Sequence, residues 1–558
     1  MKKWKEKPIW LSIILNIVIL ACLMLLFRPN FETSDDAYMN EFASGVFGQR
    51  ENHLVFINYI LGSIIRFLYE ILPIVNWYTI AQYAAVFASF TSITYVLVRT
   101  KGTELGMGVS AILITAFGYQ CYVLPQFTKT AGCLLVAGAV LIFAAFRGEK
   151  AVWQQVAAGG ILMLLGSMYR EKVFFLCLLM VFPIGVVIFF RDFFKNGYQS
   201  VTKYVIIVMI FVGVLGCAQA AFWYHDYQYA KESEWSEYLT WDTALVKLID
   251  SFFPYYQDDI ALYTDLGISE SDLRYYENWN VADTDKLSTQ SLERLVVAKD
   301  AYWISPKTKL IEFWSEFPMA FFEMSIFPYC GMLLLFVFLQ SRKREYLAYL
   351  LELGTLFAAY MYMYIGGRYA QNRVDVVVWL GAIVAILYLW EPSGEKKIQN
   401  SIVRRNLLIG IQICAIIAMC VAGNSSFRWN WNPIMEENIF ARQTEIAEDK
   451  EHLYLCTINV FGTGVTVDPF YCGTEGELSN FYLLGSWTVN TPITNQVLRE
   501  YGVENPYRDA IDNEKVYILD SANNAELLRY IQENYNEAAR LEAVKEIGNY
   551  TVYSVVTK

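Results

Sequence analysis

Two adjacent carboxylates stand early in the chain, in the segment FETSDDAYMNEFASGVFG (31–48). A carboxylate beside a substrate hydroxyl can act as a general base, and carboxylates are also ligands of divalent cations. Asp35 and Asp36 are therefore candidates for both roles. The alternative is a helix cap with a solvated acid, because Ser34 or Asp35 is a good N-cap. Apolar residues then recur at helical spacing, which predicts a short amphipathic helix on the outer surface: Met39, Phe42, Ala43 and Val46.

Basic side chains occur in several turns that are expected on the same side of the molecule as these acids. Arginine and lysine at the level of lipid headgroups suit phosphate or pyrophosphate. Beside a carboxylate pair they predict a lipid-phosphate site, in which they stabilise the charge that develops on the leaving group. Each one alone is explained as well by local pairing or by contact with anionic lipids. The phosphate-binding candidates are Lys129, Arg170, Lys172, Arg368 and Arg373, with His53 as a further site candidate.

The composition indicates which elements position these residues. The 558 residues are 55% hydrophobic and 16% aromatic, and only 18% are charged. The apolar residues cluster in long uncharged runs, which is typical of membrane-spanning helices. Nothing in the formal net charge of −11 indicates nucleic-acid binding. The chain also lacks a GxxxxGK[ST] loop and a GxGxxG fingerprint, so no nucleotide pocket is expected.

Eleven apolar runs predict about 11 transmembrane helices, since each approaches the roughly 20 residues that cross the hydrocarbon core. The runs are 9–27, 78–98, 104–124, 130–147, 152–168, 173–190, 204–223, 318–340, 347–365, 375–390 and 406–423.

The distribution of lysine and arginine predicts the orientation of these spans. With the N-terminus in the cytoplasm, every turn expected on that side carries basic residues. This holds only if segment 53–73 does not cross, and its Arg66 and Glu70 would be costly in mid-bilayer. We therefore expect 53–73 to lie in the outer interface. A true span with a compensating miscount elsewhere is the alternative.

This topology predicts a multi-pass protein of the plasma membrane with two domains. Residues 1–423 form the transmembrane domain, with a first outer loop at 28–77 and a large outer loop at 224–317. Residues 424–558 form a small extracytoplasmic α/β domain. In this domain, strands are expected at 452–456, 515–520 and 550–556, and helices at 523–535 and 538–547. A further helix is expected at 288–300 in the large outer loop. Cys456 and Cys472 either pair in this oxidising compartment or stay free.

The layout of residues 1–423 resembles that of GT-C superfamily glycosyltransferases, such as protein O-mannosyltransferases, lipid A aminoarabinose transferases and oligosaccharyltransferases. In both, one span is followed by acidic residues and short interfacial helices in the first outer loop, then by a many-span bundle. The resemblance is carried by SDDAYMNEF (34–42), the helix from His53 to Pro73 and NWYTIAQYAAVFASF (76–90). The segments LGISESDLRYYENWNV (266–281), NFYLLGSW and YGVENPYRD are similar to those of bacterial GT-C-like proteins that carry a C-terminal extracytoplasmic domain.

The resemblance implies an inverting transfer of a hexose or pentose from a polyprenyl-phosphate donor to a cell-surface glycan, lipid or protein. Asp35 or Asp36 matches the acidic position of the first loop, as catalytic base or as ligand of Mg²⁺ or Mn²⁺. The chain lacks the Pro-Pro pair that opens the second interfacial helix in several members, having ENHLVF (51–56) instead, and it lacks a WWD acceptor motif. The acceptor therefore stays open.

Two other functions fit the sequence. A flippase or transporter of lipid-linked sugars would carry charged or broken helices at the midplane, whereas the spans here are mostly uninterrupted. A non-catalytic envelope protein would bind a partner through its tail, which shows no motif. Tryptophans of the loop and tail either stack on sugar rings or serve in packing and interfacial belts: Trp235, Trp241, Trp279, Trp429, Trp431 and Trp487.

Overall fold

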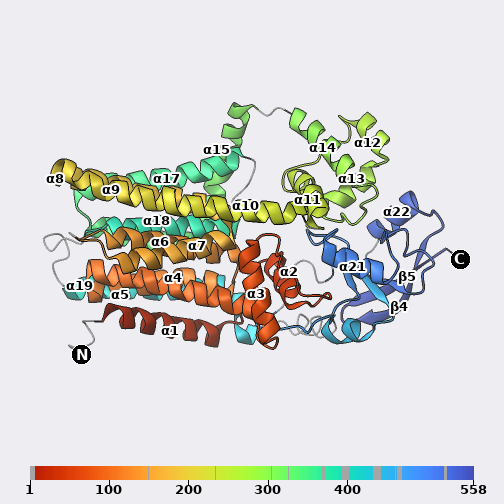
Figure 1. The fold of residues 1–558 in the computed structure, drawn as a ribbon, viewed down its shortest axis with the longest axis horizontal. Coiled ribbons are helices and arrows are strands. Elements are labelled where there is room, and N and C mark those ends of the chain that lie inside the picture. The colour runs from red at the N-terminus through yellow and green to blue at the C-terminus, as the bar shows by residue number, and fades with distance from the viewer. Residues whose placement is uncertain are drawn as a thin grey trace.

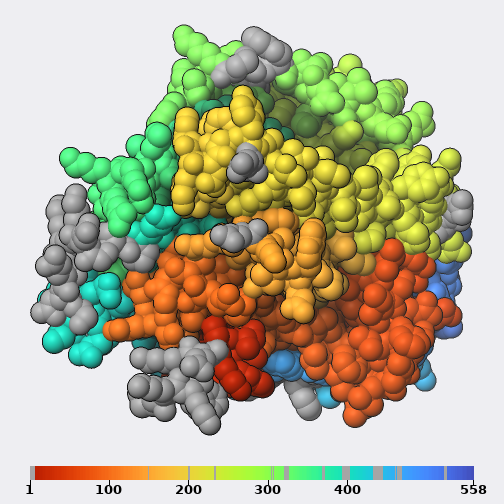
Figure 2. Space-filling view, turned by 60° about the vertical axis from the view of Figure 1, so that its left-hand side comes forward, coloured from red at the N-terminus to blue at the C-terminus, as the bar shows by residue number. Residues whose placement is uncertain are grey.

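The structure is a computed structural model that describes residues 7–148, 150–232, 234–302, 305–323, 326–366, 371–391, 401–430, 442–458, 460, 468–520 and 525–557. Long helices form a bundle at one end of the molecule, and the C-terminal sheet and the helices of the large loop lie at the other end (Figure 1). In the rotated view of Figure 2 the C-terminal residues (blue) are mostly hidden behind the bundle. The apolar part and the small α/β part are thus stacked end to end.

Every predicted apolar run falls on a helix. Nine helices in the described part of the chain are long and apolar enough to span a membrane. They are α1 (Pro8–Leu26), α4 (Trp77–Lys101), α5 (Thr103–Gly118) with its extension to Val123, α6 (Phe127–Ala145), α8 (Glu171–Asn196), α9 (Val201–Val208) continued through α10 (Gly216–Glu232), α17 (Tyr346–Ile365), α18 (Asn372–Leu389) and α19 (Ser401–Ala422).

The two remaining runs form shorter helices. Helix α7 (Trp153–Tyr169) has 17 residues and α16 (Phe327–Gln340) has 14. The run 318–340 also covers the end of α15 (Pro306–Glu323), and its residues 324–325 lie outside the described part of the chain. The structure confirms a polytopic helical bundle.

Helix α6 is the centre of the bundle, since nearly all of its residues are buried. It packs most extensively on α7, where a Cβ on Gly138 would lie 2.5 Å from the Gly159 carbonyl oxygen. Small residues of this kind let two helices approach closely in a membrane. The contact fixes the turn after α7 beside the start of α6, where several predicted site residues stand.

The first outer loop contains two helices that lie at the end of the bundle (Figure 1). Helix α3 (Tyr59–Ile71) has 13 residues, too few to span a bilayer. Arg66 and Glu70 pair along it at 3.2 Å, and Phe67 is exposed. These features agree with a segment that does not cross the membrane, and its place in the outer interface stays a prediction.

Helix α2 (Ser34–Ser44) is not the surface helix that its sequence pattern predicts. All of its residues from Asp36 onward are buried. The C-terminal domain covers it, with backbone hydrogen bonds from Gly476 N to Gly45 O and from Leu478 N to Val46 O, both 2.8 Å. The polar side of α2 finds protein partners in place of water, as when Tyr69 donates to Asn40 at 2.5 Å.

The large loop folds into helices that follow the long α10. They are α11 (Trp235–Ile249), α12 (Ile260–Leu266), α13 (Glu270–Glu277) and α14 (Thr289–Ala301). Helix α14 agrees with the expectation for 288–300. Ser288 is the N-cap of α14, and its hydroxyl accepts from Ser291 N at 3.2 Å. Helix α11 and Trp279, just after α13, contribute to the lining of the cavity described below.

The C-terminal sheet has the strand order β2-β1-β3-β5-β4. Strands β1 (Leu453–Cys456), β2 (Phe481–Leu483) and β3 (Val516–Asp520) are parallel, and β5 (Tyr550–Val556) pairs antiparallel with β3. Helices α21 (Pro492–Glu500) and α22 (Ala525–Asn534) belong to the same part. The three predicted strands and the helix predicted at 523–535 are confirmed. Cys456 and Cys472 do not form a disulfide with each other.

The helix predicted at 538–547 is wrong, because these residues form strand β4 (Arg540–Ile547). It pairs with β5 through a two-residue turn whose Gly548 has φ +56°. An edge strand is exposed on both faces, and β4 is exposed at most positions, so it carries charged residues that mimic a polar helix. The Gly-Asn turn is the sequence signal that favoured a hairpin.

Candidate functional site

A cavity of about 890 Å³ lies where the bundle, the first outer loop, the large loop and the C-terminal domain meet. Residues from all four parts line it, so no single segment of the sequence contains the site. Its charged and aromatic lining residues are Glu32, Asp35, Phe56, Phe127, Arg170, Glu171, Lys172, Trp223, Asp226, Asp242, Lys247, Asp250, Trp279, Arg373 and Trp487.

Asp35 lies in the first turn of α2 and faces this cavity. The extended backbone of Thr33 begins the helix, and a helix N-terminus stabilises a carboxylate. The indole N–H of Trp487 donates to Asp35 Oδ1 at 2.9 Å. Trp487 is only 6% exposed and packs edge-on against Tyr38 and Phe42. The C-terminal domain therefore fixes the orientation of a carboxylate in the first outer loop.

Asp36 has a different environment from its neighbour. It is fully buried and does not line the cavity. Its Oδ1 accepts from Tyr78 OH at 2.8 Å, from Gln82 Nε2 at 2.9 Å and from the Phe127 amide at 3.1 Å. Burial raises the pKa of Asp36 to about 7 in spite of these donors. Asp36 ties α2 to α4 and α6, and Asp35 is the acid that a substrate can reach.

The divalent metal that the resemblance implies stays a prediction. Mg²⁺ and Mn²⁺ need several oxygen ligands. Oδ1 of Asp36 already accepts from three donors, whereas its Oδ2 accepts from the Thr33 hydroxyl at 3.5 Å. Among the residues that the structure describes, no group of three or more His, Cys, Asp or Glu side chains is gathered to hold a metal.

Three of the predicted basic residues line the cavity. Arg170 is the single residue between α7 and α8, and Lys172 follows it in the first turn of α8. The Arg170 guanidinium lies 5.1 Å from the ring centroid of Phe56 and 5.3 Å from that of Phe127, which orients it. Arg373 reaches the cavity from the first turn of α18. Three basic residues thus share the lining of the cavity with Asp35.

The other two basic candidates are placed differently. Lys129 is buried and does not line the cavity; its ammonium pairs with Glu32 at 3.0 Å and donates to the Gln120 carbonyl at 2.8 Å. Its charge is used to hold Glu32, which does line the cavity. Arg368 lies outside the described residues.

His53 anchors the first outer loop and does not line the cavity. Its ring stacks on Trp235 at 4.3 Å and on Tyr229 at 5.8 Å. Burial lowers the pKa of His53 to about 4, so the ring is neutral at pH 7. Nearby, Asn58 donates to Asp226 at 2.8 Å and ties the same loop to α10.

The cavity also has an acidic side that the sequence did not predict. Asp226 comes from α10, and Asp242 and Asp250 come from α11 and its end. Burial, and then the neighbouring charge of Asp250, raise the pKa of Asp242 to about 7. Aspartates spaced along a polar loop helix give no signal of where they point, so only the fold could bring them together.

The predicted tryptophans divide into two groups. Trp279 and Trp487 line the cavity, whereas Trp235 and Trp241 are buried in the packing of α11. Trp429 is 67% exposed and lies outside the cavity lining. The remaining one, Trp431, is outside the described residues.

No protein-family model matches the chain, and no curated protein matches it in sequence. Its fold is similar to two crystal structures of ArnT from Cupriavidus metallidurans, and in both comparisons the match covers 97% of each chain. The apo state is 12% identical with a TM-score of 0.42, and the form bound to undecaprenyl phosphate is 11% identical with a TM-score of 0.40.

The fold is also similar to that of the Archaeoglobus fulgidus oligosaccharyltransferase in complex with Zn and sulfate. That match is 9% identical with a TM-score of 0.42, and it covers 98% of this chain and 73% of the other.

Proposed function

We propose that the protein is a membrane glycosyltransferase that moves a sugar from a lipid-phosphate donor to an acceptor hydroxyl. One observation carries the proposal: a single cavity holds the oriented carboxylate of Asp35 together with Arg170, Lys172 and Arg373. A base and a phosphate-binding cluster within one cavity are the two components that such a transfer requires.

The reaction follows from these roles. Asp35 takes the proton of the acceptor hydroxyl, whose oxygen forms a bond to the anomeric carbon of the donor sugar. The bond between that carbon and the phosphate oxygen breaks, and the lipid phosphate leaves with the electron pair. The basic residues stabilise its added negative charge. Attack from the side opposite the phosphate inverts the configuration at the anomeric carbon.

The position of the cavity suits a donor that is anchored in the bilayer. Trp223 lies in its wall on α10 and is 54% exposed, and Tyr224 and Tyr227 beside it are exposed as well. Exposed aromatic residues near the end of a span mark the membrane–water interface. A polyprenyl phosphate in the bilayer would therefore present its phosphate at the depth of the basic cluster. The positive-inside pattern favours the outer face of the plasma membrane for this site, with the N-terminus in the cytoplasm.

The two neighbouring aspartates give a matched test of the base. Cells that lack the native protein would be rescued with Asp35→Asn or Asp36→Asn, and their surface glycans would be profiled by mass spectrometry. We expect Asp35→Asn to abolish a glycan modification and Asp36→Asn to retain it, because only Asp35 reaches the cavity. Full rescue by Asp35→Asn at normal protein levels would refute the assignment of the base.

The basic cluster is tested separately by lipid binding. We expect Arg373→Gln to weaken the binding of polyprenyl phosphate to the purified protein by roughly 10- to 150-fold, since a charge-assisted hydrogen bond contributes roughly 1.5–3 kcal/mol. The control is Arg274→Gln, because Arg274 pairs with Glu270 on the surface of α13 at 2.7 Å. Equal binding by both variants would remove Arg373 from the phosphate site.

One observation favours transport as the second candidate function. Glu352 lies inside α17, is fully buried, and neither of its carboxyl oxygens has a hydrogen-bond partner in the structure. Acidic groups within spans are typical of ion-coupled transporters. A lipid-linked-sugar flippase would lose translocation on Glu352→Gln, whereas the glycosyltransferase would keep its glycan product.

A further inference from the structure

Trp279 has a backbone conformation that a bulky residue rarely adopts. Helix α13 ends with hydrogen bonds from Trp279 N to Tyr276 O at 2.9 Å and from Asn280 N to Tyr275 O at 3.4 Å. This is the Schellman ending, in which the residue at the position of Trp279 is usually glycine. Trp279 has φ +63°, in the left-handed region where a side chain with a Cβ is strained. The chain therefore keeps an indole at a position where glycine would be more stable.

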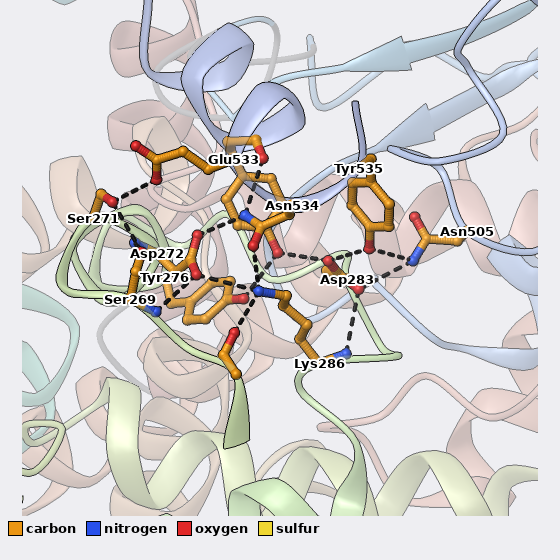
Figure 3. Close-up of polar contacts among 12 residues, drawn as sticks. Ser269, Ser271, Asp272, Tyr276, Asp283, Lys286, Asn505, Glu533, Asn534 and Tyr535 are labelled. Atoms are coloured by element: carbon orange, nitrogen blue, oxygen red, sulfur yellow. Dashed lines mark hydrogen bonds and ion pairs between the residues drawn. The ribbon is translucent and has the colours of Figure 1, made fainter. Parts of the chain in front are cut away.

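Polar contacts before and after Trp279 in the chain join the large loop to the C-terminal domain, and Figure 3 shows those of Asp272 and Asp283. Before it, Asp272 accepts from Asn534 Nδ2 at 2.7 Å. After it, Asp283 accepts from Tyr530 OH at 2.6 Å and from Tyr535 OH at 2.5 Å. These partners all belong to the C-terminal domain. The large loop is thus fixed to that domain on each side of the strained residue.

Lys286 closes the same contact. Its ammonium donates to the Gly267 carbonyl at 2.5 Å and to Asn534, and it pairs with Asp272 at 3.3 Å (Figure 3). Asp272 is buried, so this pairing satisfies a charge inside the loop–tail interface. Such a network rigidifies the segment that carries the indole.

The backbone of Trp279 also meets the segment that leads to Trp487. A Cβ on Gly485 would lie 2.3 Å from the Trp279 carbonyl oxygen, and Ala282 N donates to Leu484 O at 3.2 Å. Glycine at 485 is therefore required for this approach. Both Trp279 and Trp487 line the cavity as a result.

The acidic residues that share the cavity lining with Trp279 constrain the ligand that the cavity can take. Asp226, Asp242 and Asp250 line it from α10 and α11, with Lys247 as the basic residue contributed by α11. A phosphorylated or uronic acceptor would meet like charge here, which costs binding energy. A carboxylate accepts hydrogen bonds from sugar hydroxyls, and a protonated carboxylic acid also donates one. An indole face stacks on an apolar ring face.

We propose that Trp279 and the carboxylates of the α11 side form a subsite for an uncharged sugar ring of the acceptor. The proposal rests on the proposed function, since it makes the acceptor a neutral carbohydrate whose hydroxyl is presented to Asp35. It also explains the strained tryptophan. An indole at a glycine position lowers the stability of the fold, and the ring is kept there because it binds the ligand.

The test uses the full-length protein in detergent on an array of neutral, uronic and phosphorylated oligosaccharides. Trp279→Gly removes the ring and relieves the backbone, so its thermal unfolding midpoint should equal or exceed that of the wild type. Binding of neutral oligosaccharides should fall by about tenfold or more, which corresponds to ~1.4 kcal/mol. Trp429→Gly, at an exposed tryptophan outside the cavity, is the matched control and should bind like the wild type.

Three results would overturn the proposal: undiminished binding by Trp279→Gly, preference for uronic or phosphorylated sugars, or no neutral oligosaccharide bound above the Trp279→Gly background. Asp35→Asn separates this subsite from the proposed base. It should keep sugar binding while glycan transfer is lost. If Asp35→Asn still transfers and Trp279→Gly loses binding, the assignment of the base fails while the sugar subsite stands.

Discussion

The burial of Asp36 predicts a pH dependence of stability that asparagine should remove. Its ordinary pKa of 3.8 rises to about 7 in the folded protein because of burial. The folded state therefore keeps a proton that the unfolded state releases. The contribution of protonated Asp36 to the free energy of unfolding is fully present below about pH 4 and is lost as the pH rises to 7. The difference corresponds to ~4 kcal/mol. Asp36→Asn places a neutral amide of the same shape at this position, with an oxygen for the same three donors.

The assay compares thermal unfolding midpoints of wild type and Asp36→Asn in detergent between about pH 4 and pH 8. The variant should gain stability relative to the wild type across this range, and the two should differ least at the acid end. Subtracting one curve from the other isolates Asp36 from every other titrating group. Parallel curves, or a relative loss by the variant at high pH, would mean that the folded protein holds Asp36 as an anion.

Three further predictions concern contacts that hold the first outer loop, the large loop and the C-terminal domain in place. Trp487→Phe removes the N–H donor to Asp35 and keeps an aromatic ring, so glycan transfer should fall by about tenfold with little change in the unfolding midpoint; an unchanged transfer rate would contradict this. Gly485→Ala should clash with the Trp279 carbonyl oxygen, and limited proteolysis should cut the large loop faster than in the wild type; equal rates would show that the loop–tail contact adapts. In the wild type, the free energy of unfolding should fall by up to ~3 kcal/mol as the pH drops from 6.5 to about 4, because the folded state keeps His53 unprotonated. His53→Phe should remove this loss. An unchanged fall of the unfolding midpoint at acid pH would refute it.

The bundle was predictable because its signal is local. Runs such as Pro8–Leu26 are apolar over enough residues to satisfy every backbone group inside one helix. The strand Val516–Asp520 was equally predictable. It is nearly all buried, and its sequence is a short apolar run without alternating polar residues, which is typical of a buried parallel strand. Strand β4 was not, because an exposed edge strand and a polar helix have similar composition.

The residue types of the site were predictable, but their contacts were not, because those contacts are not local in the sequence. The acid pair and the basic turns are visible as unusual residues at expected span ends. Which aspartate faces the cavity depends on Tyr78 and Gln82, whose hydroxyl and amide point at Asp36 from another helix. Lys129 looked like a phosphate ligand, yet it is paired with Glu32 at the bundle end. Such choices are made by packing between segments that are far apart in the sequence.

The hydrogen bond between Asp35 and Trp487 joins residues that are 452 positions apart. Chains are synthesised from the N-terminus at about 5–20 residues per second, so the carboxylate waits roughly 20 to 90 s for its partner. During that time the spans insert while the cavity lacks its C-terminal wall. A ribosome that stops before Trp487 would leave an inserted bundle with an unoriented acid, so transfer would start only on chains that extend past this residue.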